Sequence, residues 1–457
     1  MKFDAITIGA GQANKPLSYA LADLGWKVAF IERAQLGGSC INTGCTPTKS
    51  LIASAQVAHY ARESARWGIH VNEVTVNFPE VVARKNRIVQ GFRDAIQKGV
   101  DRRPNIRLVH GSARFIGPHQ VQVGTETFES EKIFIDTGTA PQIPSIPGLD
   151  SVPFLTNASV MDLQEVPKHL LILGGGYIGL EFGQMFGRFG SQVTVVHSGK
   201  RLLSREDEDI VAELQKILEA DGIKFQLSAQ TKQVENRNGE ISLTIDTPQG
   251  RQTIIGSHLL VATGRKPTTA DLELAKAGIT TDDRGYIKTN SRMETNVPGV
   301  WALGDIKGGP AFTHISYNDY QIVYANVIEG KNQTIENRYL PYALFTDPQL
   351  GRVGITEAQA RASGKKFKMG LFPMTSVSRA IEKSETLGFM KIIVDAATDR
   401  ILGAGILGDE GGELVQVLGM MILANAPYTV MKGAVFIHPT MIEGFFGLMD
   451  SVKLVEA

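Results

Sequence analysis

The sequence contains very little cysteine, because Cys40 and Cys45 are the only two among 457 residues. A disulfide between residues so close in the chain closes a small ring, and by the chain-entropy account such a ring stabilises a fold only slightly. A lone short-range pair is therefore better explained by redox chemistry than by a structural role. The absence of a third cysteine means that any thiol chemistry of this protein uses this one pair.

An excess of charge is also absent, because 47 Lys and Arg residues balance 47 Asp and Glu residues. This balance gives no electrostatic reason to expect nucleic acid or an anionic membrane as a partner. No segment approaches the roughly 18 apolar residues of a membrane span, and the apolar run at the N-terminus is too short for a signal peptide. We therefore expect a cytoplasmic protein, and in that compartment an adjacent cysteine pair is more often catalytic than structural.

Glycine, by contrast, is abundant at 48 residues and clusters in motifs. Residues 4–32 predict an apolar strand that ends in Gly9 and Gly11, then an amphipathic helix and a second strand that ends in Glu32. In such a βαβ unit the glycines let the backbone approach a pyrophosphate at the helix N-terminus. Asn14 takes the place of the third glycine, so we expect a slightly wider contact between helix and strand there.

The same pattern returns in residues 169–197, where Gly174, Gly176 and Gly179 supply the turn. A single glycine match is weak evidence for a nucleotide site. Two copies, each between a predicted strand and a predicted helix, are strong evidence. The sequence therefore predicts two dinucleotide-binding sites.

The two copies differ at the end of their second strand. Glu32 lies at a position where an acid accepts hydrogen bonds from a ribose with free hydroxyls, whereas the equivalent residue of the second copy is His197. Three groups that could bind a 2′-phosphate follow it, namely Ser198, Lys200 and Arg201. Cations pair with a phosphate that an acid would repel. We assign FAD to the first site and NADPH to the second, with NADH as the alternative cofactor and a solvated loop as the alternative role of the two cations.

The remaining segments complete an α/β architecture with two Rossmann-like nucleotide-binding domains. Residues 133–141, 259–267 and 300–309 each predict an apolar strand that ends in a glycine-containing turn, and the segment from about residue 339 predicts an α+β domain with an antiparallel sheet. We divide the chain into a first FAD-binding part (1–150), an NAD(P)H-binding domain (151–275), a central segment of the FAD-binding domain (276–338) and a C-terminal domain (339–457).

Two dinucleotide units, a Cys-x4-Cys pair directly after the first and a later His-Pro-Thr motif together resemble the flavoprotein disulfide reductases. This family of class I pyridine nucleotide-disulfide oxidoreductases includes glutathione reductase, dihydrolipoamide dehydrogenase and mercuric reductase. The resemblance covers essentially the whole chain, and GGSCINTGCTPTK (37–49) is a highly specific signature. Residues 312–320 and 376–391 are most similar to mercuric-reductase-like proteins and to the bacterial reductase that protects against reactive chlorine species.

The resemblance implies a homodimer whose C-terminal domain is the dimerisation domain, and electron transfer from NADPH through FAD to the Cys40–Cys45 disulfide. It implies that Cys40 meets the substrate and that Cys45 lies against the flavin. Lys49 and Glu181 would pair near the reactive nitrogen of the flavin. The wider set that the resemblance implies for FAD is Gly9, Gly11, Glu32, Arg33, Gly38, Ser39, Lys49, Thr137, Gly138, Gly304 and Asp305.

The resemblance also implies residues that bind NADPH and residues that act on the substrate. The implied NADPH set is Gly174, Gly176, Tyr177, Ile178, Glu181, His197, Ser198, Lys200, Arg201 and Gly264. Tyr177 would be the ring that moves aside when nicotinamide binds. His438 and Glu443 would form an acid–base dyad that reaches Cys40 of the other subunit.

Elementary chemistry supports some of these roles independently of the family resemblance. Cys45 precedes a predicted helix with Pro47 in its first turn, and a thiol at a helix N-terminus near a lysine is favoured as the thiolate. His438 could hold or donate a proton if Glu443 oriented its ring, and a structural histidine with satisfied hydrogen bonds is the alternative.

The low number of cysteines narrows the range of possible substrates. Similar mercuric reductases carry a second cysteine pair near the C-terminus, and the large thioredoxin reductases carry another redox centre there, whereas this chain ends without cysteine. A small oxidant such as hypothiocyanous acid, a reactive chlorine species or a soft metal ion would then react at Cys40 directly, with His314 and Tyr317 as candidate substrate residues. Either of these two could instead be a surface or packing residue.

Three alternatives remain open from the sequence. Glutathione reductase is one, and dihydrolipoamide dehydrogenase is a second, although its usual NAD preference fits poorly with His197. The third is a flavoprotein that senses oxidants or binds a soft metal through its two thiols. Sensing does not require Lys49, Glu181 or the His438–Glu443 element, so these residues favour an oxidoreductase. We predict no resident metal site.

Overall fold

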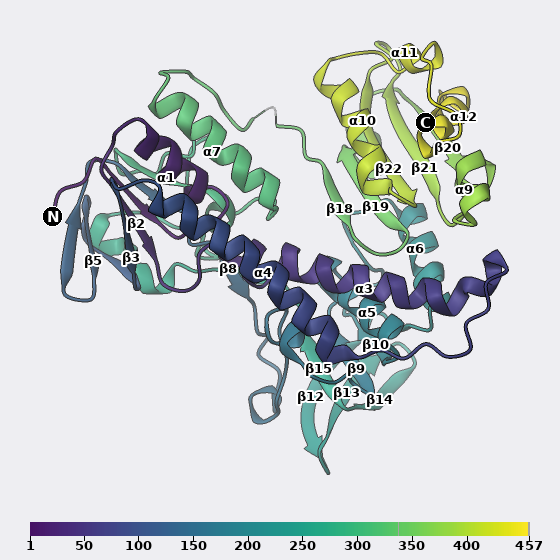
Figure 1. Cartoon of the computed structure of the whole chain (residues 1–457). Helices are drawn as coiled ribbons and strands as arrows, with labels where there is room; N and C mark the ends of the chain where they lie inside the picture. The colour runs from purple at the N-terminus through teal and green to yellow at the C-terminus, as the bar shows by residue number, and fades with distance from the viewer. Residues whose placement is uncertain (337, 456–457) are drawn as a thin grey trace.

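The computed structural model describes residues 1–336 and 338–455. Its first sheet has five parallel strands in the order β17-β7-β1-β2-β3 (Figure 1). The strands are β1 (Ala5–Ile8), β2 (Val28–Glu32), β3 (Ile106–His110), β7 (Ile133–Ile135) and β17 (Val300–Ala302). Because β17 pairs with β7, the chain returns to the first sheet after it has completed the second nucleotide unit.

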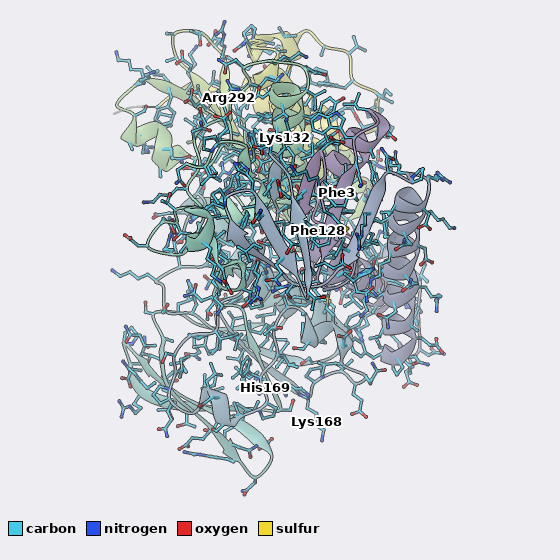
Figure 2. The ribbon with its side chains drawn as sticks, turned by 90° about the vertical axis from the view of Figure 1, so that its left-hand side faces the viewer. Phe3, Phe128, Lys132, Lys168, His169 and Arg292 are labelled. Carbon is cyan, nitrogen blue, oxygen red and sulfur yellow. The ribbon has the colours of Figure 1, made fainter. Side chains whose placement is uncertain are left out.

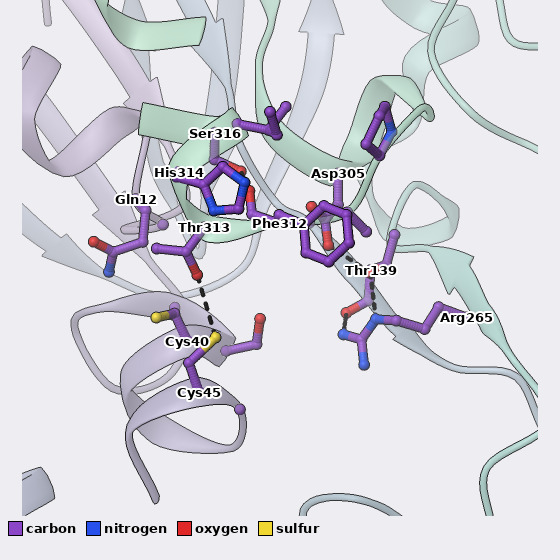
Figure 3. Close-up of a pocket in the computed structure, with 18 of the residues that line it drawn as sticks. Gln12, Cys40, Cys45, Thr139, Arg265, Asp305, Phe312, Thr313, His314 and Ser316 are labelled. Atoms are coloured by element: carbon purple, nitrogen blue, oxygen red, sulfur yellow. Dashed lines mark hydrogen bonds between the residues drawn. The ribbon is translucent and has the colours of Figure 1, made fainter. Parts of the chain in front are cut away.

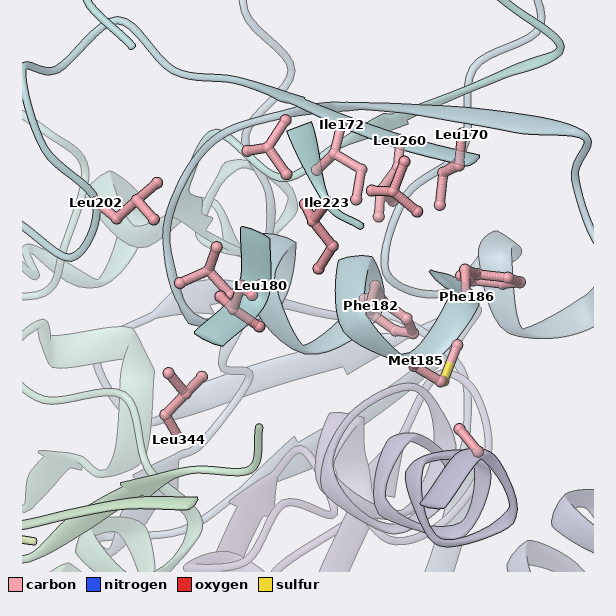
Figure 4. Close-up of a cluster of buried hydrophobic side chains, with 14 of the residues drawn as sticks. Leu170, Ile172, Leu180, Phe182, Met185, Phe186, Leu202, Ile223, Leu260 and Leu344 are labelled. Carbon is pink, nitrogen blue, oxygen red and sulfur yellow. The ribbon is translucent and has the colours of Figure 1, made fainter. Parts of the chain in front are cut away.

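The second sheet has four parallel strands in the order β11-β10-β9-β15. These are β9 (His169–Leu173), β10 (Gln192–Val196), β11 (Lys224–Gln226) and β15 (His258–Val261). Leu170 and Ile172 share a core with Phe182 of the following helix (Figure 4), whereas Leu171 and Leu173 belong to a core on the other face. Burial on both faces explains why β9 is a continuous apolar run.

In the described part of the chain, seven helices accompany the two nucleotide units, and each unit has its own helix directly after the glycine turn. They are α1 (Asn14–Asp23), α2 (Gly38–Asn42), α3 (Cys45–Glu63), α4 (Phe78–Asp101), α5 (Tyr177–Phe189), α6 (Glu208–Ala220) and α7 (Thr313–Val327). The long helices α3 and α4 pack against each other and run through the middle of the molecule, and α3 also packs on α5 (Figure 1).

The two glycine turns have the same local geometry. Gly9 has a φ of +92° and Gly174 a φ of +116°, a region that favours glycine. A Cβ at either glycine would lie 2.3 Å from a carbonyl oxygen at the end of the neighbouring strand, that of Asp136 or Ala262. Each turn therefore needs glycine because the adjacent parallel strand ends directly against it.

The third glycine position is filled differently in the two copies. A Cβ at Gly179 would lie 2.1 Å from the Gly174 oxygen, so only glycine fits the second copy. In the first copy, Asn14 is fully buried and its side-chain amide donates to the carbonyl oxygens of Ile8 at 3.1 Å and Phe134 at 3.0 Å. The extra volume that the sequence predicts at Asn14 is thus used to join α1 to two strands.

The C-terminal segment forms a six-stranded antiparallel sheet in the order β18-β19-β22-β21-β20-β23. Its strands are β18 (Tyr342–Leu344), β19 (Gln349–Gly354), β20 (Phe367–Pro373), β21 (Phe389–Asp395), β22 (Ile401–Gly408) and β23 (Lys453–Leu454). Its helices are α8 (Glu357–Ala362), α9 (Ser378–Lys383), α10 (Gly411–Leu423), α11 (Thr429–Lys432) and α12 (Gly444–Asp450). The predicted fold class, two Rossmann-like units and a C-terminal α+β domain, is confirmed.

Smaller sheets complete the fold. They are β4 (Ala113–Gly117), β5 (Gln120–Val123) and β6 (Glu126–Glu129); β12 (Gln230–Arg237), β13 (Glu240–Thr247) and β14 (Gly250–Gly256); and the pair β8 (Thr139–Pro141) and β16 (Arg265–Pro267). Phe3 packs on Phe128 of β6, with 5.9 Å between ring centroids (Figure 2). Among the residues described, no helix is both long and apolar enough to cross a lipid bilayer.

Candidate active site

Two close backbone contacts bring the cysteine pair to the first nucleotide unit. Gly38 has a φ of +62°, and a Cβ on it would lie 2.9 Å from Gly11 Cα, so α2 begins against the first glycine turn. A Cβ on Gly44 would lie 2.7 Å from a carbonyl oxygen of α2, which places the start of α3 beside it. Cys40 lies within α2 and Cys45 is the first residue of α3, so both sulfurs face one site (Figure 3).

The two cysteines are free thiols, and their pKa values are shifted in opposite directions. A hydrogen bond from Cys40 is the largest cause that lowers the pKa of Cys45 to about 6, and the Thr313 hydroxyl and the Lys49 cation lower it further. The same hydrogen bond, together with burial, raises the pKa of Cys40. The site therefore stabilises a thiolate on Cys45 and a proton on Cys40, as the position of Cys45 at a helix N-terminus predicts.

Lys49 lies one helical turn after Cys45 and pairs with Glu181 of α5, with 2.7 Å between Nζ and Oε2. The other oxygen of Glu181 accepts a hydrogen bond of 2.9 Å from the backbone N–H of Phe345. The Lys49 ammonium also lies 4.7 Å from the centre of the Phe345 ring. Three elements, α3, α5 and the segment after β18, thus fix the cation beside Cys45.

The thiols open into a large cavity of about 2030 Å³. Besides Cys40, Cys45 and Glu181, the predicted flavin residues that line it are Gly9, Gly11, Glu32, Arg33, Gly38, Ser39, Lys49, Thr137, Gly138 and Asp305. Gly304 is buried behind this wall, where a Cβ would lie 2.5 Å from the Asp136 carboxyl group. The cavity runs from Glu32 and Arg33 at the end of β2 to the thiols, and this continuity fits an extended dinucleotide such as FAD.

The acid at the end of β2 is already held in place. Glu32 is mostly buried, and its carboxylate accepts hydrogen bonds from the backbone N–H groups of Ala10 at 2.7 Å and Ala34 at 2.8 Å. Two donors from the protein orient this carboxylate at the cavity wall, where it could also accept from ribose hydroxyls.

Asp136 is a buried acid at this site that the sequence reading missed. Its Oδ2 accepts hydrogen bonds of 3.1 Å from the N–H groups of Ala13 and Asn14, at the N-terminus of α1. Burial raises the pKa of Asp136 well above the ordinary value. The buried Asn14 Oδ1 beside it has no hydrogen-bond partner. Comparison of the two copies of the repeat could have revealed this acid, because the second copy has Ala262 at the position of Asp136.

Asp305 is the second residue of the short 3₁₀ helix that follows β17, and it lines the cavity. The Thr139 hydroxyl donates to Asp305 at 3.1 Å, and Arg265 donates to the Thr139 hydroxyl and carbonyl oxygens, both at 2.7 Å (Figure 3). Burial raises the pKa of Asp305, although Arg265 opposes this shift. The resulting acceptor, backed by a cation, suits the hydroxylated chain of a flavin, so the residues present fit FAD.

His197 lies beneath the second glycine turn. Its Nδ1 accepts a hydrogen bond of 3.2 Å from the N–H of Gly175, so the ring proton is on Nε2. Burial lowers the pKa of His197, which leaves the ring neutral. His197 therefore shapes the turn and brings no charge to a bound nucleotide. Gly264, with a φ of +139°, lies between β15 and β16.

The two cations that follow His197 are in different environments. Arg201 already has an acid partner, because its guanidinium lies 3.0 Å from Glu208. Ser198 and Lys200 are exposed at the end of β10. Lys200 is thus a solvent-exposed cation after this strand, whereas Arg201 is partly buried and paired.

His314 and Tyr317 lie on the same helix, and the structure separates them. His314 lines the cavity, next to Thr313, and its Nε2 lies 2.6 Å from the carbonyl oxygen of Pro341. Burial lowers the pKa of His314, so its ring is neutral and donates through Nε2. Tyr317 is 46% exposed, packs against Tyr320 with 5.3 Å between ring centroids, and is not among the described residues that line the cavity.

His438 and Glu443 lie in the C-terminal domain and form a pair. His438 Nδ1 is 3.1 Å from both carboxylate oxygens of Glu443, and the N–H of Thr440 also donates to that carboxylate. The hydrogen bond from Thr440 is the largest cause that lowers the pKa of Glu443. His438 has a 71% exposed side chain, and neither residue is among those described that line the cavity of their own chain.

Comparison with known proteins is consistent with this geometry. A family model described as pyridine nucleotide-disulphide oxidoreductase matches residues 3–319, and the dimerisation domain of the same family matches residues 340–447. The chain is 37% identical, over 99% of its length and 100% of the relative, to a probable pyridine nucleotide-disulfide oxidoreductase, RclA, of Escherichia coli. It is 34% identical to a mercuric reductase of Streptomyces lividans, over 96% of this chain and 94% of that one.

Solved structures give the same result. The structure described as an HOCl-induced flavoprotein disulfide reductase, RclA from Escherichia coli, has a TM-score of 0.91 and 36% identity over 98% of this chain and 100% of that chain. A Cu(II) complex of the same protein matches with the same TM-score and identity, over 98% of this chain and 99% of that chain. The first family model covers the thiols and both glycine turns, and the second covers most of the C-terminal domain. The protein therefore belongs to the pyridine nucleotide-disulphide oxidoreductase family and is a flavin-dependent disulfide reductase that uses a pyridine nucleotide.

Proposed function

We propose that the protein transfers two electrons from NADPH to a small oxidised substrate at Cys40, with Cys45 as the second thiol of the reaction. The observation that carries the proposal is the pair of free thiols on the cavity wall, with the thiolate favoured on Cys45 beside Lys49. The glycine turn of the first unit, Glu32 and Asp305 would hold FAD. When bound, FAD would supply the two-electron exchange between the nucleotide and the Cys40–Cys45 disulfide.

Reduction of hypothiocyanous acid by these thiols balances in atoms and electrons. The Cys40 thiolate attacks the electrophilic sulfur of the substrate, which forms a sulfur–sulfur bond to the thiocyanate group and releases hydroxide. The Cys45 thiolate then attacks the sulfur of Cys40, which closes the disulfide and releases thiocyanate. The protein loses two electrons and the substrate gains two.

The acid–base pair of the second subunit has a defined task in this scheme. Cys40 retains its proton because its pKa is raised, so a base must take that proton before Cys40 can attack. His438, oriented by Glu443, would accept this proton and return it to the departing hydroxide, which leaves as water. The match of residues 340–447 to the family's dimerisation domain supports a homodimer that brings the pair to Cys40.

Two features support a small oxidant over a large disulfide substrate. The chain has no third cysteine to relay electrons outwards, so the substrate must reach the cavity itself. The similar enzyme from Escherichia coli is described as HOCl-induced, and this description points to reactive chlorine chemistry. Copper is a second candidate, because two adjacent thiols suit a soft metal and the same relative was solved as a Cu(II) complex.

The preference for NADPH over NADH is part of the proposal, and Lys200 supports it. Lys200 is exposed at the end of β10 and no acid stands at that strand end, whereas Arg201 is occupied by Glu208. Lys200→Glu should lower kcat/KM for NADPH about tenfold or more and leave kcat/KM for NADH nearly unchanged. Arg201→Glu is the matched comparison, with a smaller expected loss. A wild-type enzyme that used NADH as efficiently as NADPH would overturn the assignment.

The substrate test is a screen of NADPH oxidation over hypothiocyanous acid, cupric ion, mercuric ion, glutathione disulfide and lipoamide. Hypothiocyanous acid should support the fastest turnover, and Cys40→Ser should abolish it. Anaerobic NADPH titration should produce a long-wavelength absorption band from a thiolate against the flavin, and the band should disappear in Cys45→Ser. Faster turnover of glutathione disulfide or lipoamide would replace the proposed substrate, while absence of the band would reject the thiol mechanism.

The shared active site is tested by mixing two inactive variants. Cys40→Ser lacks the attacking thiol and His438→Ala lacks the acid–base group, so each homodimer should be inactive. A mixed dimer contains one site in which an intact Cys40 faces an intact His438, so activity should return on mixing. If activity did not return while mixed dimers formed, His438 would not act across the interface.

A further inference from the structure

Glu206 is a buried carboxylate that the reaction described above does not use. It lies just before α6, and its side chain is completely buried. Its Oε1 accepts hydrogen bonds from the hydroxyl groups of Tyr177 at 3.0 Å and Tyr342 at 2.5 Å. Its Oε2 accepts from Nε of Arg352 at 3.1 Å. A buried carboxylate requires such partners, and here both oxygens are satisfied.

One of these partners lies where the nucleotide must enter. Tyr177 is the first residue of α5, directly after the second glycine turn, and it lines the same cavity as Cys45 and Lys49. A nucleotide held at that turn has to pass the Tyr177 ring to reach the cavity. The ring packs edge-on against Phe312 and Tyr342, with centroids 6.5 and 5.9 Å away.

We propose that Glu206 is a positioning residue that holds the Tyr177 ring across the nicotinamide entrance, through the hydrogen bond to the tyrosine hydroxyl. This inference rests on the proposed use of a pyridine nucleotide at the second unit. In the closed position the hydroxyl donates to Glu206, and in the open position that hydrogen bond is broken. Binding of the nicotinamide must therefore compete with this contact.

The second tyrosine keeps the cost of opening small. When Tyr177 leaves, the Tyr342 hydroxyl still donates to the same carboxylate oxygen and Arg352 still donates to the other. No buried carboxylate oxygen is left without a partner, so opening costs about one hydrogen bond and not the desolvation of a charge. Tyr342 is therefore the residue that makes the tether reversible.

Glu206 itself is anchored to the C-terminal sheet. Arg352 on β19 and Lys391 on β21 flank Gly405 of β22, and both side chains are buried. Arg352 pairs with Asp207 at 2.6 Å and Lys391 approaches the same carboxylate at 3.7 Å. The start of α6 is thus bound to the C-terminal domain, which gives Glu206 a fixed position from which to hold Tyr177.

The contact at Gly405 shows how close this docking is. A Cβ at Gly405 would lie 2.6 Å from the side chain of Ile210 in α6, so a larger residue there would displace that side chain. Tyr342 also belongs to this domain, at the start of β18. The closed position of Tyr177 is therefore defined by residues of the C-terminal domain as much as by its own.

Two hydroxyl deletions on the holoenzyme test the proposal, because they should act in opposite directions. Tyr177→Phe keeps the ring and loses only the tether, so the dissociation constant of NADP⁺ measured by calorimetry should fall roughly two- to tenfold, the effect of one hydrogen bond. KM for NADPH should fall in parallel with little change in kcat. Tyr342→Phe leaves Glu206 dependent on Tyr177, so the dissociation constant of NADP⁺ should rise.

Equal NADP⁺ binding by wild type and Tyr177→Phe, or a shift of both variants in the same direction, would overturn the proposal and leave Tyr177 as a packing residue. The melting temperature of each variant reports whether folding is intact, and each tyrosine keeps its ring volume in phenylalanine. Binding of NADP⁺ is measured without turnover. Failure of the proposed thiol reaction would therefore appear in the anaerobic NADPH titration and not in this measurement.

Discussion

The hydroxyl group of Thr313 lies 3.3 Å from the sulfur of Cys45, so the first residues of α7 and α3 meet at one atom. Both residues lie at the start of a helix, where the backbone carries partial positive charge. The hydrogen bonds from Cys40 and Thr313 and the cation of Lys49 lower the pKa of Cys45 to about 6. The thiolate is therefore prepared by backbone geometry as well as by side chains.

Thr313→Val should raise the pKa of Cys45, because valine keeps the shape of threonine and removes the donor. The expected shift is up to about one unit, the effect of one hydrogen bond of roughly 1 kcal/mol. The pH dependence of alkylation of reduced Cys45, measured in Cys40→Ser, reports this value. Thr313→Ser keeps the hydroxyl and should behave as wild type. If valine and serine gave the same pKa, the Thr313 contact would have no part in stabilising the thiolate.

Removal of Lys49 should destabilise the protein through Glu181. The Glu181 side chain is almost fully buried and keeps only the N–H of Phe345 when the ammonium is lost. Lys49→Met should lower the free energy of unfolding by about 1–3 kcal/mol, and Glu181→Gln in the same background should recover part of it. Chemical denaturation of the two single variants and the double variant measures the coupling. Strictly additive losses would show that the 2.7 Å contact contributes no coupling energy.

Asp136→Asn should reduce the loss of folding stability that occurs as the pH rises. The folded-state pKa of Asp136 is raised by burial, with Asp305 and Asp319 nearby, so its contribution to stability is present at low pH and declines as the pH rises. The decline begins near pH 4, the ordinary value of about 3.9 for an aspartate, and continues up to the folded-state pKa. Asparagine keeps an oxygen to accept from Ala13 and Asn14 and removes the titration.

The measurement for Asp136 is the denaturation midpoint of both proteins between about pH 4 and pH 8. The difference in favour of Asp136→Asn should grow across this range. Retention of FAD, followed by the fluorescence of released flavin, should improve in the same direction, because a negative charge at the start of α1 repels a pyrophosphate. A constant difference between the two proteins at every pH would contradict a titration of Asp136.

His314→Ala should slow reduction of the substrate by the thiols and leave reduction of the flavin by NADPH unchanged. The ring lies on the cavity wall next to Thr313, the residue that contacts Cys45, and is held by the Pro341 carbonyl oxygen. Stopped-flow absorbance separates the two half-reactions. Tyr320→Phe, on the same helix and outside the described cavity lining, should match wild type. An unchanged turnover in His314→Ala would remove this residue from the substrate site.

Much of the fold and of the flavin site could be read from local patterns. Gly9, Gly11 and Glu32 lie within one βαβ unit, where strand, turn and helix follow one another with fixed spacing. The same holds for Cys40 and Cys45, whose separation of five residues already implied a shared redox role. Such motifs are recognisable because the residues that must meet are close in the chain.

Which residue of a helix faces the cavity could not be read in this way. His314 and Tyr317 are three positions apart in the chain, and the sequence offered no reason to separate them. Packing of α7 directs His314 to the cavity and leaves Tyr317 against Tyr320. The acid Asp136 escaped notice for a similar reason, since its partners Ala13 and Asn14 lie more than a hundred positions away.

The sequence by itself determined the two nucleotide units, the single redox pair and the family, because each depends on short-range spacing. The tertiary structure decided the contacts between distant segments: Thr313 against Cys45, separated by 268 positions, and Tyr342 beside Tyr177 on the Glu206 carboxylate. These contacts exist because the parallel strand order returns β17 to the first sheet and because α6 docks on the C-terminal sheet. No local sequence pattern predicts these contacts, because their geometry is set by the packing of whole domains.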